Sequence, residues 1–364
     1  MAFSALFLSP RVSVPKFSPS HLPNPKPHHL AFSIRCSSSS SSSSSSPRRC
    51  RASFDLRSYW TGLISEIEAE LEAAIPVRYP EWIYEAMRHA VLSGGAKRAS
   101  PVMCVAACEL LGAPRAAAFP TAAALEMAHA ASLVHDDLPC MDAAPLRRGR
   151  PSTPALFGVS TAVLAGDALF PLGFAHVIAR TPPALVPRPA LLRVLAEIAR
   201  AVGSTGMAAG QFLDLSGAAA GGEAEVLLVL EKKFGEMAEC SAVCGGLLGG
   251  ADEDDAAALR RYGRAVGVLY QLVDDVLMED EEGVGSNGRS PGKMRSNASA
   301  VRALGIDRAL EIVEELKDKA KSELRRFDDK CGERVLPLYS FVDYAVHRGF
   351  LVAGAGAGAG GNEV

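Results

Sequence analysis

The amino-acid sequence predicts an all-α fold, a single helical bundle, on three observations. The chain has 364 residues, of which 48% are hydrophobic, enough for one large core. From Leu56 onward, apolar residues recur at the spacing of amphipathic helices. Alternating runs typical of strands are scarce. These features favour one bundle domain over a sheet protein or a mixed fold.

The helical pattern divides into successive segments separated by turn-forming residues. Pro80 opens the second segment and Gly94-Gly95 closes it, the usual asymmetry of helix ends. The polar segment 281–299 contains Gly and Ser and predicts a long loop. The predicted helices cover 57–74, 80–92, 101–112, 117–138, 159–180, 188–207, 224–249, 254–280, 304–327 and 335–350.

The N-terminal segment 1–52 is predicted to be a disordered plastid transit peptide. It contains the serine run 37–46 and seven basic residues, and the first acidic residue of the chain is Asp55. A disordered low-complexity tail is the alternative, but such a tail has no reason to exclude acidic residues. The folded domain is then expected over 53–351, and the Gly/Ala-rich segment 352–364 is expected to be flexible.

Charge and hydropathy restrict the kind of partner. The whole chain has 38 basic and 41 acidic residues. Without the first segment, 31 basic residues remain against 41 acidic ones, a net charge of −10. A domain this acidic is a poor nucleic-acid binder and suits carboxylates that hold metal ions. No stretch approaches the roughly 18 uncharged apolar residues that a membrane-spanning helix needs, so a soluble protein without a transmembrane segment is expected.

Two Asp-Asp pairs lie at matching places, each after an apolar helical stretch. The first is Asp136-Asp137, followed by Asp142, and the second is Asp274-Asp275. Buried carboxylates need a cation or hydrogen bonds, and Mg²⁺ prefers carboxylate oxygens together with substrate phosphates. Each pair alone could mark a solvent-exposed helix end. Two pairs in matching contexts predict a magnesium–diphosphate site between two helices.

Basic residues near the first pair strengthen this prediction. Arg147-Arg148-Gly149 follows the first pair, and Lys97-Arg98 lies upstream of it. In many proteins such residues form ordinary surface ion pairs. Beside metal-binding carboxylates they could instead bind the oxygens of a second diphosphate, because arginine offers a fork of donors.

The stretch DDLPCMD…LRRGRPS, with GGAKR before it and YQLVDD after it, resembles the trans-isoprenyl diphosphate synthases, in particular the plant geranylgeranyl diphosphate synthase group. The similarity covers about Leu56 to Tyr344. It implies an isoprenoid-synthase-type bundle with a central cavity and Mg²⁺ as cofactor. The implied reaction ionises an allylic diphosphate, and isopentenyl diphosphate attacks the resulting carbocation. Mg²⁺ stabilises the charge of the departing diphosphate.

The resemblance implies site residues one by one. Taken alone, His129 could equally be a core histidine and Lys233 a solvated lysine. The implied Mg²⁺ ligands are Asp136, Asp137, Asp142, Asp274 and Asp275. The implied diphosphate contacts are Lys97, Arg98, His129, Arg147, Arg148, Lys233 and Gln271.

Several positions depart from the family pattern. Met278 stands where the second motif normally has a third Asp, and a thioether is a poor ligand for Mg²⁺. Ser100 replaces an arginine of the isopentenyl-diphosphate pocket, and the basic stretch after the second motif survives only as Gly292-Lys293. Each lost contact can cost about 10²–10³-fold in rate. The chain alone is therefore expected to be inactive or weakly active, with its Mg²⁺ binding vestigial.

Two cysteine pairs predict a partner. Cys104 with Cys108, and Cys240 with Cys244, each place two thiols on one helix face. Close helix packing explains either pair alone. Together they resemble the paired Cys-x-x-x-Cys motifs of the small subunits of heterodimeric plant prenyl diphosphate synthases, of the type II or recruiting-protein kind. There, the motifs contribute to the contact with the catalytic large subunit.

The resulting hypothesis is a plastid regulatory subunit that binds a geranylgeranyl diphosphate synthase large subunit, as a heterodimer or heterotetramer, and raises or redirects its output. It could act in the stroma or be recruited to thylakoid complexes, and diphosphate substrates could still bind it. The alternative is a self-sufficient Mg²⁺-dependent prenyltransferase of low activity. A terpene cyclase-like enzyme would tolerate a damaged second motif, but Lys97-Arg98 and Arg147-Arg148 argue against it.

Overall fold

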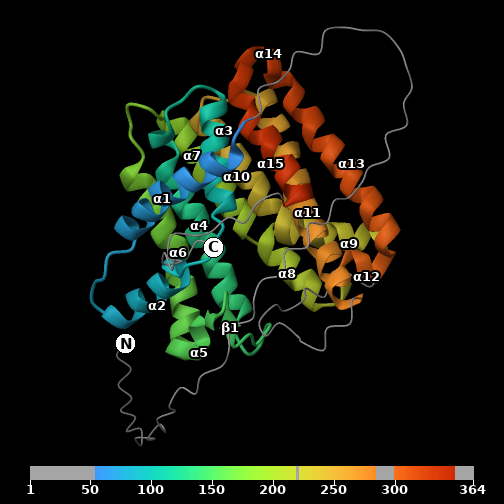
Figure 1. Cartoon of the computed structure of the whole chain (residues 1–364). Helices are drawn as coiled ribbons and strands as arrows, with labels where there is room; N and C mark the ends of the chain where they lie inside the picture. The colour runs from blue at the N-terminus through green and yellow to red at the C-terminus, as the bar shows by residue number, and fades with distance from the viewer. Residues whose placement is uncertain (1–53, 219–220, 284–298, 349–364) are drawn as a thin grey trace, which may run out of the picture. The chain divides into compact units, whose positions relative to one another are not determined.

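The computed structural model describes residues 54–218, 221–283 and 299–348, and these are almost entirely helical, which confirms the all-α prediction (Figure 1). The predicted transit peptide, most of the predicted loop 281–299 and the tail 352–364 lie outside the described residues. The helices are α1 (Leu56–Ala74), α2 (Glu81–Leu92), α3 (Ala99–Leu110), α4 (Phe119–Asp136), α5 (Thr153–Phe157), α6 (Val159–Arg180), α7 (Arg188–Val202), α8 (Met207–Leu215), α9 (Glu223–Leu230), α10 (Glu236–Leu248), α11 (Glu253–Gly283), α12 (Ala300–Leu304), α13 (Ile306–Leu324), α14 (Asp328–Cys331) and α15 (Leu336–His347).

The first helix shows why these segments fold as helices. Asp55 caps α1, because its carboxylate accepts a hydrogen bond from the backbone N–H of Ser58 at 3.0 Å. The apolar residues of α1 fall on one face, where Trp60, Ile67 and Leu71 are fully buried. The helix is therefore fixed by a polar cap at its start and by one apolar stripe along its length.

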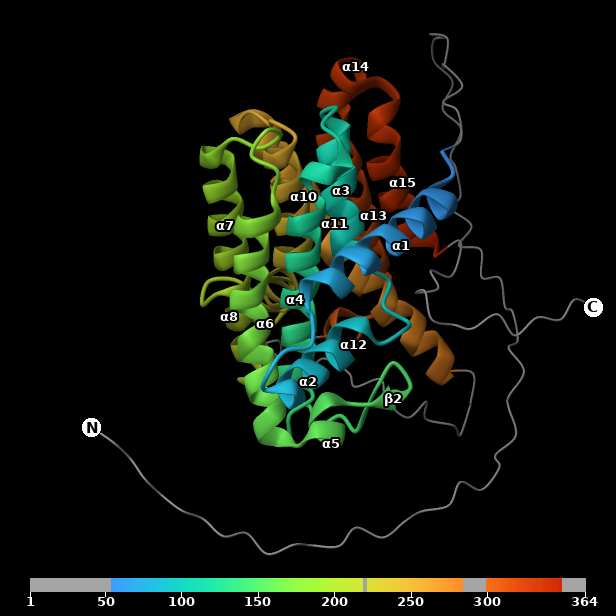
Figure 2. The ribbon, with the colours of Figure 1, turned by 90° about the vertical axis from the view of Figure 1, so that its left-hand side faces the viewer.

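The helices α4 and α10 lie in the middle of the bundle. Helix α4 packs along α6, and α10 packs on α3, α7 and α11. The last long helices, α13 and α15, lie against α11 on the side away from α6 and α7 (Figures 1 and 2). One large apolar cluster runs through these layers. The two Asp-Asp pairs thus come from α4 and α11, which belong to one packed core.

Small residues bring α3 and α10 close together. A Cβ added at Gly245 would lie 2.1 Å from the backbone oxygen of Cys104, and one added at Gly249 would lie 2.9 Å from that of Cys108. These distances are too short for any side chain. The close approach of the two helices therefore depends on glycine at both positions.

The structure corrects the predicted helix 188–207. Helix α7 ends at Val202, and a separate helix, α8, follows. A Cβ at Gly206 would meet the backbone oxygen of Ala201 at 2.1 Å, so the chain turns sharply there. The predicted helix 224–249 instead forms α9, a π-helical turn η3 (Glu231–Gly235) and α10. Such π turns are frequent at functional sites, and this one holds Lys233.

One short β-hairpin interrupts the helices. Strand β1 (Leu146–Arg147) pairs antiparallel with β2 (Arg150–Pro151), with Arg147 opposite Arg150. The two residues of its turn, Arg148 and Gly149, both have positive φ, 53° and 76°. The hairpin follows directly from the Arg-Arg-Gly-Arg sequence and fixes where Arg147 and Arg148 lie.

Helix α6 bears on the expectation that no segment is an uncharged apolar membrane span, although Asp167 lies within this helix. Among the described helices, α6 passes this test of length and composition, with a mean hydropathy of 1.7 over its most apolar window. Leu169 and Val177 are fully buried, whereas Leu164 and Ile178 are 57% and 60% exposed. A core helix of a soluble protein passes the same test, and α6 packs along α4 within the bundle.

Candidate functional site

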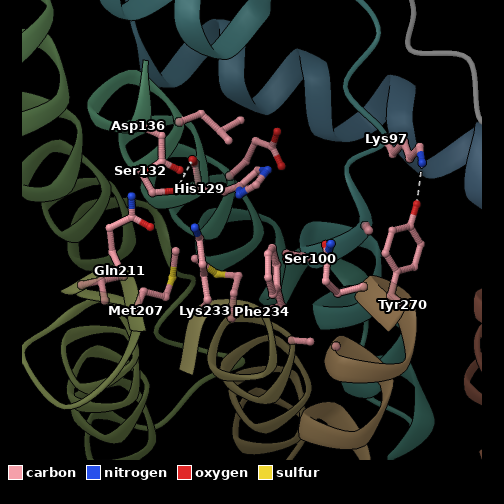
Figure 3. A pocket seen from close by; sticks show the side chains of 18 of the residues that line it. Lys97, Ser100, His129, Ser132, Asp136, Met207, Gln211, Lys233, Phe234 and Tyr270 are labelled. Atoms are coloured by element: carbon pink, nitrogen blue, oxygen red, sulfur yellow. Dashed lines mark hydrogen bonds between the residues drawn. The ribbon is translucent and has the colours of Figure 1, made fainter. Parts of the chain in front are cut away.

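A cavity of about 830 Å³ lies between α3, α4, α8, η3 and α11. Polar side chains gather at one part of it, around Asp136, His129 and Ser132, and Met207 and Phe234 line another part (Figure 3). Seven of the predicted site residues line this cavity: Lys97, Arg98, His129, Asp136, Arg148, Lys233 and Gln271. One cavity therefore brings together residues from five parts of the chain.

The first aspartate motif forms where α4 ends. The loop after the helix turns back, so that the backbone N–H of Asp142 donates to the backbone oxygen of Asp136 at 2.8 Å. The pKa of Asp136 is raised to about 6, chiefly by burial. The positive charge of Lys233 lowers this pKa, and the negative charges of Asp142 and Asp137 raise it. Burial also raises the pKa values of Asp137 and Asp142. A divalent cation would relieve this repulsion.

The first motif suits a metal that arrives with its substrate. Among the described residues, no three His, Cys, Asp or Glu side chains converge into a ready-made metal cluster. Mg²⁺ usually takes only one or two protein carboxylates and completes its shell with water and phosphate oxygens. Asp136 and Asp142 fit that role, because they are close, partly buried and mutually repulsive.

The raised pKa of Asp136 makes a stability prediction. Without metal, Asp136→Asn is expected to raise the free energy of unfolding at pH 7 by about 2 kcal/mol. The folded pKa of about 6 exceeds the ordinary 3.8, so the stability from protonated Asp136 is complete below 3.8 and lost as pH rises through 6. The advantage of Asn should therefore vanish near pH 4. Urea unfolding in EDTA across this range tests it, and a difference independent of pH would contradict it.

Two of the predicted diphosphate contacts are held by carboxylates. The guanidinium of Arg147 donates to both oxygens of Asp137, with Nε 3.1 Å from Oδ1. Lys233 Nζ donates to Asp214 Oδ2 at 2.6 Å. Of these two cations, Lys233 lines the cavity and Arg147 is not among its lining residues. A diphosphate could replace the carboxylate as the acceptor of either cation.

Arg98, a predicted diphosphate contact, is paired with carboxylates of its own chain. Its side chain is 1% exposed and forms an ion pair with Glu126 at 2.5 Å, with Glu68 3.6 Å away. It also donates to the backbone oxygen of Val91 at 2.8 Å. Like Arg147 and Lys233, Arg98 would have to leave a carboxylate partner in order to hold a diphosphate. Its diphosphate contact stays a prediction, and in this structure it joins the start of α3 to α4.

His129 and Lys97 line the cavity from two different sides. Burial lowers the pKa of His129, although the nearby Glu126 carboxylate raises it. Ser132 Oγ donates to the backbone oxygen of His129 at 2.8 Å. Lys97 Nζ donates to the hydroxyl of Tyr270 at 2.5 Å (Figure 3). Ser100 on α3 also lines the cavity, at the position where the family pattern has an arginine.

The second aspartate motif is occupied by contacts within the chain. Asp274 accepts a hydrogen bond from Arg348 Nη2 at 2.8 Å. Asp275 accepts one from Gln271 Nε2 at 2.9 Å and another from the backbone of Ala300. Burial raises the pKa of Asp275 to about 6. The side chain of Met278 lies outside the described residues. Protein donors hold Asp274 and one oxygen of Asp275, while Asp275 Oδ2 is buried without a hydrogen-bond partner. Asp274 is therefore the carboxylate of this motif that does not fit a metal ligand as it stands.

Four residues of the site had not been predicted. Gln211 and Asp214 lie three positions apart on α8 in an otherwise apolar stretch, and that spacing could have flagged them. Both side-chain polar atoms of Gln211 are buried in the cavity wall without a protein partner. Tyr270 directly precedes the predicted Gln271. No sequence pattern near Arg348 indicates its role, because its partner Asp274 lies 74 residues earlier in the chain.

The predicted interface cysteines lie in the interior. Cys104, Cys108, Cys240 and Cys244 are all 0% exposed. Cys240 Sγ lies 3.7 Å from Cys244 Sγ, and Cys244 Sγ lies 3.8 Å from the backbone oxygen of Val194 on α7. Direct contact between these thiols and a partner is therefore excluded in this arrangement. What stays a prediction is a position behind the interface, where they set the packing of α3, α7 and α10.

The family model for polyprenyl synthetases matches residues 80–289. The chain is 56% identical over 342 residues to the heterodimeric geranylgeranyl pyrophosphate synthase small subunit, chloroplastic, of Arabidopsis thaliana, covering 93% of this chain and 98% of the relative. It is 37% identical over 303 residues to large subunit 1 of the same species, covering 82% and 80%. An FPP/GFPP synthase crystal structure from Zymomonas mobilis superposes with a TM-score of 0.69 at 28% identity, covering 80% of this chain and 99% of that one. The chain belongs to the polyprenyl synthetase family.

Proposed function

We propose that this chain is the regulatory small subunit of a heterodimeric plastid geranylgeranyl pyrophosphate synthase. The observation that carries the proposal is the asymmetry of its two aspartate motifs. Asp136 of the first motif lines the cavity, and the charge of the neighbouring Asp142 raises its pKa. In the second motif, Arg348 and Gln271 donate to the carboxylates. A site with one working half suits a subunit that assists a catalytic partner.

The similar proteins support a plastid location and a partner. The names of the similar proteins from Arabidopsis thaliana call them chloroplastic, in agreement with the predicted location. The small-subunit relative is named as one half of a heterodimer, and a large subunit is also related to this chain. Recruitment of such a heterodimer to thylakoid complexes stays a prediction.

An exposed apolar surface on α6, α7 and α8 supports docking of the large subunit. The three helices are neighbours on one side of the bundle (Figure 2). Each of these helices exposes large apolar side chains, and such side chains mark candidate protein contacts where they gather on one surface. We call these residues the α6–α8 surface, and they are Val159, Leu164, Ile178, Leu192, Phe212 and Leu215.

The chain's own residues could still bind an allylic diphosphate. Asp136 and Asp142 would hold Mg²⁺, which stabilises the charge of the departing diphosphate. Arg147 and Lys233 would exchange their present carboxylate partners for diphosphate oxygens. The apolar wall around Met207 and Phe234 would surround the prenyl tail and exclude water. This intact half favours the alternative function, a weak prenyltransferase that needs no partner.

Mixing experiments separate the two functions. The purified chain alone is expected to turn over isopentenyl and allylic diphosphates at least about 10²-fold more slowly than its mixture with a plastid large subunit. Size-exclusion chromatography with light scattering should show a heterodimer or heterotetramer. The mixture should differ from the large subunit alone in rate or in product chain length.

Asp136→Asn in this chain is the matched control. If the subunit is regulatory, the mixture containing the variant should keep the wild-type rate, because catalysis occurs in the partner. Turnover by the chain alone at the rate of the mixture, abolished by Asp136→Asn, would overturn the regulatory proposal and establish the alternative.

A further inference from the structure

The contact between Arg348 and the second aspartate motif supports the proposed function, and the inference drawn from it rests on that function and deepens it. Arg348 is at the C-terminal end of α15, and its side chain is 15% exposed. Its Nη2 donates to Asp274 Oδ1 at 2.8 Å and to the backbone oxygen of Tyr270 at 2.7 Å. The guanidinium carbon stands 3.5 Å above the centre of the Tyr270 ring. One side chain thus holds α11 by an ion pair, a backbone contact and a ring contact.

The backbone of Arg348 has an unusual conformation where this contact forms. Its φ is 47°, a left-handed conformation that a residue other than glycine adopts only when its surroundings compensate the strain. Its N–H donates to the backbone oxygen of Tyr344 at 2.9 Å and ends α15. Within the described residues, Asp274 is the one carboxylate that forms an ion pair with the guanidinium. Charge and shape therefore both direct Arg348 to the second motif.

We infer that Arg348 is the resident cation of the second aspartate motif, in the place of a divalent metal ion. A guanidinium at 2.8 Å supplies Asp274 with both a positive charge and a directed donor. The neighbouring Asp275 accepts hydrogen bonds from Gln271 and from the backbone of Ala300, and its Oδ2 is buried without a hydrogen-bond partner. To bind Asp274, a metal ion would have to displace the guanidinium of Arg348, whose positive charge repels a cation.

The inference changes the role of the motif. Asp274 joins α11 to Arg348 at the end of α15. Tyr270 lies one helical turn earlier on α11; its ring packs under the guanidinium of Arg348, and its hydroxyl accepts a hydrogen bond from Lys97. The second motif becomes a structural clamp, and metal binding is left to Asp136 and Asp142. If the second motif binds no metal ion, a third carboxylate is not needed, and Met278 can stand in its place.

Counting Mn²⁺ ions on the purified full chain tests the inference. Isothermal titration or electron paramagnetic resonance with Mn²⁺, in the presence of inorganic pyrophosphate, should give the same stoichiometry for wild type and Asp274→Asn. Asp136→Asn should lose Mn²⁺. Arg348→Gln keeps the size and a donor but removes the charge, and it should gain one Mn²⁺ per chain. The double variant Arg348→Gln/Asp274→Asn should return to the wild-type number.

Arg348→Lys is the matched control, since it keeps the charge and should gain no Mn²⁺. Circular dichroism and thermal unfolding establish that each variant is folded before it is titrated. Loss of Mn²⁺ on Asp274→Asn in the wild-type background would overturn the inference, and so would an Arg348→Gln variant that gains none. These measurements use the chain alone, so they stand or fall separately from the mixing experiment on the heterodimer.

Discussion

Gly245→Ala is expected to lower the free energy of unfolding by about 3 kcal/mol, the upper end of ordinary overpacking. The added Cβ would lie 2.1 Å from the backbone oxygen of Cys104 and 2.8 Å from the Cβ of Ala107. A backbone oxygen cannot rotate away, so α3 and α10 must separate. The cavity between them and α4 would then lose its shape. Urea unfolding followed by circular dichroism measures the cost.

Gly62→Ala is the matched control, because a Cβ at this helical glycine has no atom within 4 Å. Alanine should stabilise that exposed position in α1 by up to about 1 kcal/mol. Cys240→Ser with Cys244→Ser should cost less than Gly245→Ala, since a helical hydroxyl can donate to the preceding turn, as Ser241 does to Met237 at 2.8 Å. Equal effects of Gly245→Ala and Gly62→Ala would contradict the close packing of α3 and α10.

The cysteine motifs show where prediction from spacing stops. The i, i+4 pattern places Cys104 with Cys108, and Cys240 with Cys244, on one face of each helix. It does not tell whether that face meets another helix of the same chain or a partner subunit. The burial of all four thiols assigns the face to the chain's own core. An apolar stripe of small residues fits both surroundings, because both need close approach.

The site divides in the same way between local and distant contacts. The first motif could be recognised from the sequence as one unit, because Asp136, Asp137 and Asp142 lie within one helix end and its loop. The ion pairs Lys233–Asp214 and Arg348–Asp274 join different helices. An arginine at the end of a helix has many possible partners, and only the fold selects one. The sequence could indicate which basic residues lie near the cavity, but it could not indicate which carboxylate each of them pairs with.

Ile178→Asp together with Leu192→Asp is expected to abolish heterodimer formation at micromolar concentration. Ile178 is 60% exposed near the end of α6, and Leu192 is 67% exposed near the start of α7. A desolvated apolar contact at the centre of an interface contributes about 2 kcal/mol or more. Two such losses weaken association about 10³-fold at 1.4 kcal/mol per tenfold change. Buried carboxylates without partners add to the loss.

The folded chain itself should tolerate these substitutions, because both side chains already face solvent. Thermal unfolding should therefore change little, in contrast to Gly245→Ala, which acts from within the bundle. Ile306→Asp on α13 is the matched control, since Ile306 is 39% exposed and belongs to a helix outside the α6–α8 surface. It should leave association with the large subunit intact. If light scattering shows that the α6–α7 double variant still binds the large subunit, the docking surface lies elsewhere. If the wild type pairs only with itself and the variant does not, the surface binds a second copy of the chain.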